Sequence, residues 1–504
     1  METELKLLLA PRDLRRLRRD PRVKALQQGR ASTRRVHSVY YDTPEHGLLR
    51  AGLALRLRRD GTRWMQTLKA EGESAGGLHL REEWEWPLPG AALDFGLIAT
   101  TPQAKRFRSL RLRAKLAPVF STEFERTSLR LAFADGSLAE LCLDSGEIRS
   151  GRRANAISEA EIELLAGSTA RLFELALELS ERVPLRLGQA SKAARGYALA
   201  RALRARPVKA AALELDAQSS VAAAFATIAR NCIVHLQANE AGILAGRDPE
   251  FLHQVRVAMR RLRASFSLFK SLLPQALFAP VLEQMRQPGS VLGAARNWDV
   301  FVHEALRGLR AQHADEAALA AFERRCIRLR RVRMRAAQAV VAAGPWQRLW
   351  LELGRVLADA AWQQEQAALA LPVGGYAADQ LQQRAARLRK RGKRLRKLDA
   401  AGRHRLRIAA KKLRYAVEFF AALYPKRRVR AYVRSLAGLQ DVLGGLNDAA
   451  NVLRLLPEAI AGARAPDAHV AGMIQGWSAA CTHLQLDALS QAWQHWQDQK
   501  PFWR

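Results

Sequence analysis

Ionisable side chains recur at every second residue in four segments of the N-terminal third of the chain. The members are Glu2, Glu4 and Lys6; Arg56 and Arg58; Arg81, Glu83 and Glu85; and Glu159, Glu161 and Glu163. Because successive side chains of a strand point to opposite faces, each segment predicts a strand with one charged face. Carboxylates bind Mg²⁺ or Mn²⁺, and Arg and Lys bind phosphate oxygens. Together these faces could hold a polyanion that is accompanied by a divalent metal.

One such segment alone could be a solvated surface strand, and the repetition is what favours a site. Charged faces that converge cannot form an apolar core, because burying unpaired charges is strongly penalised. They would line a wet cavity instead. Such a cavity suits phosphoryl transfer, which demands positioning and charge neutralisation more than covalent chemistry. No Ser-His-Asp or reactive-cysteine arrangement in the sequence indicates a competing chemistry.

The composition predicts an anionic partner. The chain has 504 residues, with 82 lysines and arginines against 48 acidic residues and a formal net charge of +34. Such an excess suits polyphosphate, nucleic acid or an acidic membrane surface. The four cysteines show no CxxC pairing, so neither a zinc site nor a disulfide framework is expected.

Nothing in the sequence predicts export or membrane insertion. Glu2 follows Met1 without the basic and apolar regions of a signal segment, and no uninterrupted apolar run is long enough to span a bilayer. We therefore expect a soluble, cytoplasmic protein with reduced thiols and no membrane partner.

The elements that must position the charged faces are short helices and strands, followed by a long helical part. A helix is predicted over 11–26, an arginine-rich helix over 101–116, and a hairpin turn at Asp60-Gly61. The predicted strands are 1–6, 36–41, 53–59, 63–69, 78–86, 119–133, 137–143 and 157–165. From about residue 213, apolar residues follow a helical spacing and strand signals end. The predicted fold class is α+β, with a β-rich N-terminal part and an all-α C-terminal part.

An ordered set of motifs accompanies the charged segments. Glu2-Thr3-Glu4-Leu5-Lys6 resembles the ExExK signature of the CYTH superfamily, the triphosphate tunnel metalloenzymes. The motifs that follow in the order of that superfamily are Tyr41-Asp42-Thr43-Pro44, Leu55-Arg56-Leu57-Arg58, Leu68-Lys69, Arg81 with Glu83 and Glu85, Arg126, Glu140 with Asp144-Ser145-Gly146, Glu159-Ala160-Glu161-Ile162-Glu163 and Ser191-Lys192. The resemblance implies a closed eight-stranded antiparallel tunnel over 1–203 that acts on a triphosphate group with Mg²⁺ or Mn²⁺.

By position in these motifs, the resemblance implies a role for each charged residue. The carboxylates that would face the metal are Glu2, Glu4, Asp144, Glu161 and Glu163, with Glu159 as a further candidate. The cations that would clamp phosphate oxygens are Lys6, Arg56, Arg58, Lys69, Arg81, Arg126 and Lys192. Glu83, Glu85 and Glu140 could instead orient the basic residues, and Arg126 could form an external ion pair.

The helical part contains an internal repeat. The segment around His253 recurs around His404, 151 residues later, and Leu292-Gly293 recurs as Leu443-Gly444 at the same offset. Helical spacing gives two basic stripes, made of His253, Arg256, Arg260 and Arg263 and of His404, Arg407, Lys411 and Arg414. A single stripe would be read as a solvated helix face, whereas its duplication favours anion binding. The two histidines could alternatively cap or join helices.

These stripes resemble the CHAD domain, a conserved-histidine α-helical domain that often follows a CYTH domain and is associated with polyphosphate binding. Arg296-Asn297-Trp298-Asp299-Val300 resembles its RDxDV element, with Asn297 in place of Asp, and Leu446-Asn447-Asp448 resembles the counterpart in the second half. The resemblance implies a linker over 204–214 and a duplicated helical bundle over 215–504 that binds long-chain polyphosphate.

The sequence therefore predicts a metal-dependent inorganic triphosphatase that hydrolyses tripolyphosphate to diphosphate and phosphate, similar to bacterial CYTH-CHAD inorganic triphosphatases. Two alternatives stay open. A CYTH enzyme could act on an organic triphosphate, either thiamine triphosphate or ATP. The tunnel could also be vestigial in a protein that binds polyphosphate or nucleic acid. Nucleic acid is the weaker candidate, because neither interleaved exposed aromatic residues nor a helix-turn-helix is evident.

Overall fold

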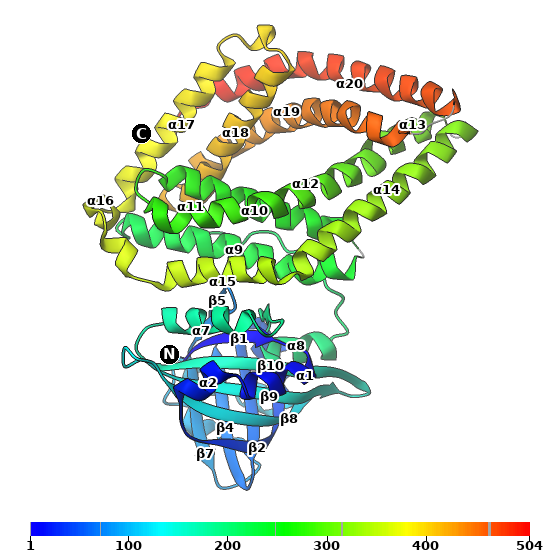
Figure 1. Cartoon of the computed structure of the whole chain (residues 1–504). Coiled ribbons are helices and arrows are strands. Elements are labelled where there is room, and N and C mark those ends of the chain that lie inside the picture. The colour runs from blue at the N-terminus through cyan, green and yellow to red at the C-terminus, as the bar shows by residue number, and fades with distance from the viewer. Residues whose placement is uncertain (1, 71, 247, 314–315, 462–464, 504) are drawn as a thin grey trace. The chain divides into compact units, whose positions relative to one another are not determined.

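The computed structural model describes residues 2–70, 72–246, 248–313, 316–461 and 465–503. The chain divides into two compact units, and the chain can be followed from blue to red in Figure 1. The tunnel unit comprises residues 1–206 and 343–359, and the helical unit comprises residues 207–342 and 360–504. The predicted order of a β-rich part and an all-α part is confirmed.

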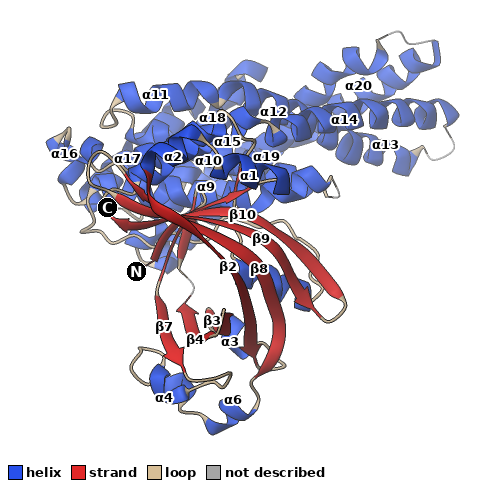
Figure 2. Cartoon of the chain, turned by 60° about the horizontal axis from the view of Figure 1, so that its bottom comes forward, coloured by secondary structure: helices blue, strands red, loops and turns tan. Residues whose placement is uncertain are grey.

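The tunnel unit is built around one antiparallel sheet that curls on itself, drawn in red in Figure 2. Its strands are β1 (Glu2–Leu8), β2 (Gln27–Asp42), β3 (Leu53–Asp60), β4 (Arg63–Ala70), β5 (Glu73–Ala75), β6 (Leu78–Arg81), β7 (Glu83–Leu88), β8 (Ala117–Ala132), β9 (Leu138–Ser150), β10 (Arg153–Ala166) and β11 (Arg186–Leu187). The strand order is β5-β6-β1-β10-β9-β8-β2-β3-β4-β7, with β11 paired to β1.

One segment of chain closes this sheet. The sequence predicts a single strand over 78–86, whereas the structure interrupts it at Glu82 to give β6 and β7. Strand β6 pairs with β1, and β7 pairs with β4, at the other end of the strand order. The Ala70 N–H donates to the Glu82 carbonyl at 3.0 Å across the interruption. If β6 and β7 are counted together and the short β5 and β11 are set aside, the described strands form the predicted eight-stranded tunnel.

Several predicted elements differ in extent. The helix predicted over 11–26 is two helices, α1 (Pro11–Arg18) and α2 (Pro21–Leu26), because Pro21 starts a new helix behind the Asp20 cap. The helix predicted over 101–116 is α5 (Ala104–Phe107) and α6 (Leu110–Ala114), since the Ser109 side chain caps a new start. The Asp60-Gly61 hairpin forms as predicted, with Gly61 at φ +61° and Asp60 paired with Arg63.

Helices pack against the sheet, and one of them comes from the second half of the sequence. Helices α7 (Ala170–Ser180) and α8 (Lys192–Ala200) follow the last long strand. Helix α15 (Gly344–Ala358) packs on α7, and its Gln347 side chain accepts a hydrogen bond from the Leu187 N–H at 3.0 Å. The sequence predicts one helical domain over 215–504, whereas residues 343–359 belong to the tunnel unit in the structure.

The helical unit contains no strand among its described residues beyond one isolated bridge. Its main helices are α9 (Val221–Ala245), α10 (Pro249–Phe269), α11 (Gln275–Gln284), α12 (Arg286–Val300), α13 (Arg307–Gln312), α14 (Ala317–Ala342), α17 (Val373–Gly392), α18 (Ala400–Phe420), α19 (Lys426–Ile460) and α20 (Ala465–Gln497). Asp248 and Asp399 cap the two helices that carry the basic stripes, α10 and α18.

Helix α9 is long and apolar enough to cross a membrane by length and composition alone. In the structure, 67% of the apolar stretch of α9 that could cross a membrane is buried inside the protein. It packs against α10 and α14. A single helix of this kind is weak evidence for a membrane span, because a buried core helix has the same composition.

Candidate functional site

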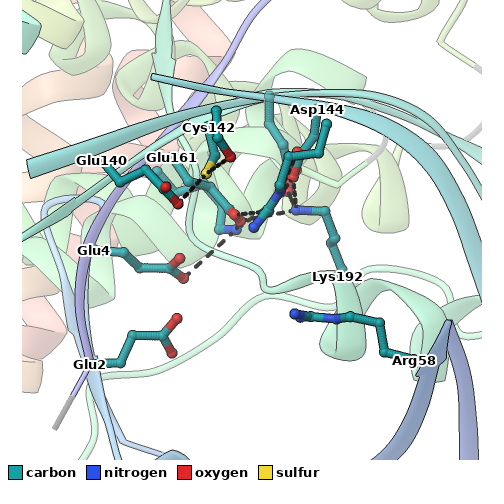
Figure 3. Close-up of polar contacts among 12 residues, drawn as sticks. Glu2, Glu4, Arg58, Glu140, Cys142, Asp144, Glu161 and Lys192 are labelled. Atoms are coloured by element: carbon teal, nitrogen blue, oxygen red, sulfur yellow. Dashed lines mark hydrogen bonds and ion pairs between the residues drawn. The ribbon is translucent and has the colours of Figure 1, made fainter. Parts of the chain in front are cut away.

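The charged strand faces converge on the interior of the tunnel. The cavity there has a volume of about 220 Å³. Its lining contains seven carboxylates and eight cations: Glu2, Glu4, Glu83, Glu85, Glu140, Glu161 and Glu163, with Lys6, Arg34, Arg56, Arg58, Lys69, Arg81, Arg126 and Lys192. Figure 3 shows Glu2 and Glu4 on one side of this space and Arg58 on the opposite side. The interior is therefore ionic, as the alternation of the four segments predicted.

Strand register determines which charges meet. On β1, Glu4 is paired with Glu163 of β10, and Lys6 is paired with Glu161. On the other edge of β1, Glu2 is paired with Arg81 of β6. Side chains at paired positions point to the same face of the sheet, so these groups are neighbours on the tunnel wall.

Three buried carboxylates form the densest part of the wall. Oxygens of Asp144, Glu159 and Glu161 lie within 4.8 Å of one another, a spacing that could hold a metal ion. Lys192, the first residue of α8, reaches them from the tunnel interior: its Nζ lies 2.6 Å from Asp144 Oδ2 and 3.0 Å from Glu161 Oε1. Lys6 forms ion pairs with Glu159 at 3.3 Å and with Glu161. We call Lys6, Lys192, Asp144, Glu159 and Glu161 the lysine cluster.

Arg126 joins the lysine cluster through a fork. Its Nε and one terminal nitrogen donate to the two oxygens of Asp144 at 2.7 and 2.6 Å, and the same terminal nitrogen donates to Glu161 at 2.6 Å. Burial would raise the pKa of Glu161, but Lys192, Lys6 and Arg126 hold it well below its usual value. The carboxylates of this cluster therefore stay ionised, which is the form that binds a metal. Arg126 is therefore an internal group, and its ion pairs in the described part of the chain are with Asp144 and Glu161.

A second set of ion pairs lies around Glu2 and Glu4. Arg81 donates to Glu2 through Nε at 2.9 Å and to Glu4 through a terminal nitrogen. Lys69 lies 3.1 Å from Glu2. Deeper in this set, Arg56 lies 3.3 Å from both Glu83 and Glu85.

Arg58 is weakly paired. Its nearest carboxylate, Glu85, is 3.5 Å away. Burial and the neighbouring Arg56 lower the pKa of Arg58 to about 10. An anion in the cavity would remove this mutual repulsion of the cations.

Glu163 lies among other carboxylates and forms no ion pair with a described residue. Burial, followed by the charges of Glu2, Glu4 and Glu140, raises the pKa of Glu163 to about 7. A group of hard oxygen ligands that repel one another fits Mg²⁺ or Mn²⁺, which would neutralise them. Both this group and the lysine cluster therefore have donor sets that suit a divalent cation.

The structure brings together every tunnel residue that the resemblance implied. Asp144 has no exposed surface and lies behind Arg126, while the other eleven line the cavity directly. The sequence reasoning gave no site role to Arg34, which also lines the cavity, and left Glu140 and Glu159 as secondary candidates. Their signal was available, because Glu140 shares a strand face with Asp144 and Glu159 shares one with Glu161 and Glu163.

In the helical unit, the two stripes face each other from α10 and α18. Arg260 donates to the Tyr415 hydroxyl on α18 at 3.3 Å. Burial, together with Arg407 and Arg260, lowers the pKa of Lys411 to about 7. Burial, Arg260 and Arg296 lower the pKa of Arg256 to about 10. Cations of α10, α18 and α12 therefore lie close enough to repel one another. A bound anion would relieve this repulsion, as expected of an anion-binding site.

The members of the stripes differ in how far they are engaged by the protein itself. Arg414 forms an ion pair with Glu418 at 2.7 Å, and Arg263 donates to the Met285 carbonyl at 2.6 Å. His404 Nδ1 lies 3.1 Å from the Asn447 side-chain oxygen. Burial and Arg296 lower the pKa of His253 to about 4, so this imidazole is neutral around pH 7. Arg296 of α12 lies beside His253 and Arg256, although the sequence assigned it no binding role.

Comparison with known proteins agrees with this arrangement. Residues 1–197 match the CYTH domain family, and residues 227–457 match the CHAD domain family. The chain is 34% identical to an inorganic triphosphatase of Haemophilus influenzae over 167 residues, which are 32% of this chain and 45% of that protein. The chain thus spans less than half of the length of this relative. The crystal structure of the CHAD domain from the plant Ricinus communis is 34% identical, covers 57% of this chain and 96% of its own, and has a TM-score of 0.50.

Proposed function

Because the chain carries a CYTH domain followed by a CHAD domain, we propose that its tunnel unit is a metal-dependent triphosphatase that hydrolyses inorganic tripolyphosphate to diphosphate and phosphate. The observation that carries the proposal is the cavity of about 220 Å³ whose wall alternates carboxylates and cations. The likeness to an inorganic triphosphatase supports it. A purely anion-binding tunnel would have no use for seven carboxylates, so a vestigial tunnel is the weaker explanation.

The cations of the wall would bind the phosphate chain. Arg126 and Arg81 present guanidinium forks, which fit phosphate oxygens in a bidentate manner. In the structure both forks are held by carboxylates, Arg126 by Asp144 and Arg81 by Glu2. Phosphate oxygens would replace or share these partners, so the forks are already oriented before the substrate enters. Lys6, Arg56, Arg58, Lys69 and Lys192 would neutralise the remaining phosphate charge.

The carboxylates would hold Mg²⁺ or Mn²⁺. The candidate ligands are Glu2, Glu4, Glu163 and Glu140 in one group and Asp144, Glu161 and Glu159 in the other. A bound divalent ion neutralises phosphate charge and can lower the pKa of a water molecule so that it attacks in line. Lys192, Lys6 and Arg126 hold the pKa of Glu161 low, so the second group would meet the ion with ionised oxygens, whereas Glu163 would give up its proton to bind it. The choice between Mg²⁺ and Mn²⁺ and the cytoplasmic location stay predictions.

A specific observation favours an organic triphosphate as the second candidate substrate. A neighbouring pocket of about 200 Å³ shares Lys69 and Arg81 with the tunnel lining. Its remaining wall is largely apolar and includes Leu49, Leu80 and Tyr197. Such a wall could hold the organic part of thiamine triphosphate or ATP while the phosphates occupy the tunnel.

A substrate panel decides between the two. The full chain is incubated with tripolyphosphate, thiamine triphosphate, ATP or long-chain polyphosphate, each with Mg²⁺ or Mn²⁺, and released phosphate is measured. We expect the highest kcat/KM with tripolyphosphate. Glu4→Gln and Lys6→Ala should abolish that activity, while Glu125→Gln, an exposed position on β8, should leave it unchanged. Hydrolysis by Glu4→Gln at the parent rate would overturn the assignment of the site.

For the helical unit we propose binding of long-chain polyphosphate between the two stripes. The cations of α10 and α18 repel one another there, and a flexible chain of phosphates would bring their counter-charge. The expected contacts are His253, Arg256, Arg260, Arg263, His404, Arg407, Lys411 and Arg414. A titration with fluorescent single-stranded DNA tests the alternative partner: polyphosphate should displace the DNA, and failure to displace it would favour a nucleic-acid function.

A further inference from the structure

A second basic pocket lies on another face of α18, away from the stripe. It has a volume of about 190 Å³ and lies between α17 and α18, which pack side by side. Its lining consists of Arg384, Arg387, Arg391, Arg405, Ile408, Ala409 and Lys412, and we call it the α17/α18 pocket. Positions 405, 408 and 412 share one face of the helix, roughly a third of a turn around from the stripe of His404, Arg407 and Lys411. The pocket is therefore separate from the site proposed above.

The charge of this pocket is not balanced by the protein. Five of its seven lining residues are cations, and none of the seven is acidic. In the part of the chain that the structure describes, none of these five cations forms an ion pair, although ion pairs are frequent elsewhere in both units. Burial and three arginines of the pocket lower the pKa of Lys412, as expected when cations are crowded without a counter-charge.

Arg384 gives the pocket a fixed, buried donor. Its side chain is only 6% exposed, and one terminal nitrogen donates to the Ser267 carbonyl on α10 at 2.9 Å. Its Nε is buried and has no hydrogen-bond partner in the described structure. A buried guanidinium nitrogen without an acceptor is costly, and a ligand oxygen in the pocket would supply one.

The size and donors of the pocket define the ligand class. Ligand pockets for drug-sized molecules usually measure about 300–1,000 Å³, so a smaller pocket suits a compact ligand. Four guanidinium groups and one ammonium suit a multivalent oxyanion, because Arg forks match phosphate geometry. We propose that the α17/α18 pocket is a binding site for a phosphate or diphosphate group, distinct from the tunnel and from the two stripes.

The test compares two double variants that remove the same charge from the full chain. Arg405→Gln with Lys412→Met alters two exposed members of the pocket. Arg396→Gln with Lys397→Met alters two exposed residues of the adjoining segment that do not line it. Isothermal titration with sodium diphosphate in the presence of EDTA is expected to show a site that the first variant weakens about tenfold or more and the second retains. Circular dichroism confirms that both variants are folded.

A second arm identifies the source of the phosphate group. If the pocket takes part of a polyphosphate chain, the pocket variant also weakens binding of long-chain polyphosphate, and the control variant does not. If the pocket takes free diphosphate, polyphosphate affinity is equal in both variants while diphosphate affinity still differs. Equal affinity of parent, pocket variant and control variant for both ligands would overturn the proposal. None of the substituted residues lines the tunnel cavity, so tripolyphosphate hydrolysis is expected to stay unchanged and a failure here is distinguishable from a failure of the triphosphatase assignment.

Discussion

Glu4 and Glu163 lie directly opposite each other on the neighbouring antiparallel strands β1 and β10, and both side chains line the tunnel cavity. Like charges at facing positions of a sheet are destabilising. The cost is visible in the pKa of Glu163, which burial and the nearby acids raise to about 7. A divalent cation between them would convert this repulsion into binding.

Replacing Glu163 with Gln should separate stability from function. Without metal, at pH 8 and in EDTA, the substitution removes a repelled carboxylate and is expected to raise the melting temperature. With Mg²⁺ or Mn²⁺ it should lower metal affinity at least about tenfold and reduce tripolyphosphate hydrolysis with it. Thermal melts and metal titrations measure both effects. Glu125→Gln serves as the control, and a lower melting temperature of Glu163→Gln in EDTA would contradict the account.

Removing Lys192 should be far more damaging than removing an exposed lysine. Lys192→Met leaves Asp144, Glu159 and Glu161 buried with fewer cations, and breaking a buried pair costs about 3–5 kcal/mol. The matched control is Lys115→Met, which breaks the exposed pair with Glu45 and should change the free energy of unfolding little. Urea unfolding gives both free energies. Equal costs for the two variants would show that the lysine cluster does not stabilise the tunnel.

Polyphosphate binding by the helical unit should depend on pH through Lys411. Burial and the neighbouring arginines lower its pKa to about 7, so it is charged below pH 7 and neutral above, until a bound phosphate raises the pKa again. Affinity is therefore expected to fall as pH rises through and beyond 7, with proton uptake on binding. Lys411→Arg keeps its charge and should flatten this dependence. Titrations at pH values on both sides of 7 test it, and identical profiles for both proteins would exclude Lys411 as the cause.

The contact of α15 with α7 should be sensitive to a single methyl group. A Cβ on Gly354 would lie 2.3 Å from Phe173 Cε1, so Gly354→Ala overpacks the interface and is expected to cost about 1–3 kcal/mol. Gly344→Ala in the same helix meets nothing within 4 Å and is the control. Unfolding midpoints measure both. Phe173→Leu in the Gly354→Ala background should restore part of the loss, and no restoration would place the strain elsewhere.

Most of the tunnel residues could be predicted from strand alternation. When charged residues occupy every second position, the two-residue period of a strand shows which side chains share one face. Glu140 was only a secondary candidate because an acidic residue at this position could equally orient the basic residues, and the sequence does not distinguish the two roles. Lys192 could not be derived from alternation at all. It is the first residue of helix α8, which packs on the inner face of the sheet, and only the resemblance pointed to it.

Helical spacing placed the stripes on α10 and α18 but could not say how far each stripe extends. The fourth member follows the first by ten residues, which on a helix rotates it by about 80°. Accordingly, Arg263 donates to the Met285 carbonyl, and Arg414 forms an ion pair with Glu418 of the same helix. The sequence also could not predict that α15 belongs to the tunnel unit. Trp346 and Trp350 indicate a buried helix face but do not show which core they pack into.

The position of α15 in the sequence imposes an order on biosynthesis. A ribosome must translate through residue 359 before the tunnel unit has all of its parts. The apolar surface of α7 that contacts α15 therefore stays exposed while α9 to α14 are translated. Shortened versions of this protein that stop near residue 206 would expose the same surface permanently. Expression of the isolated CYTH part should therefore include residues 343–359, for instance joined behind residue 206 by a flexible linker.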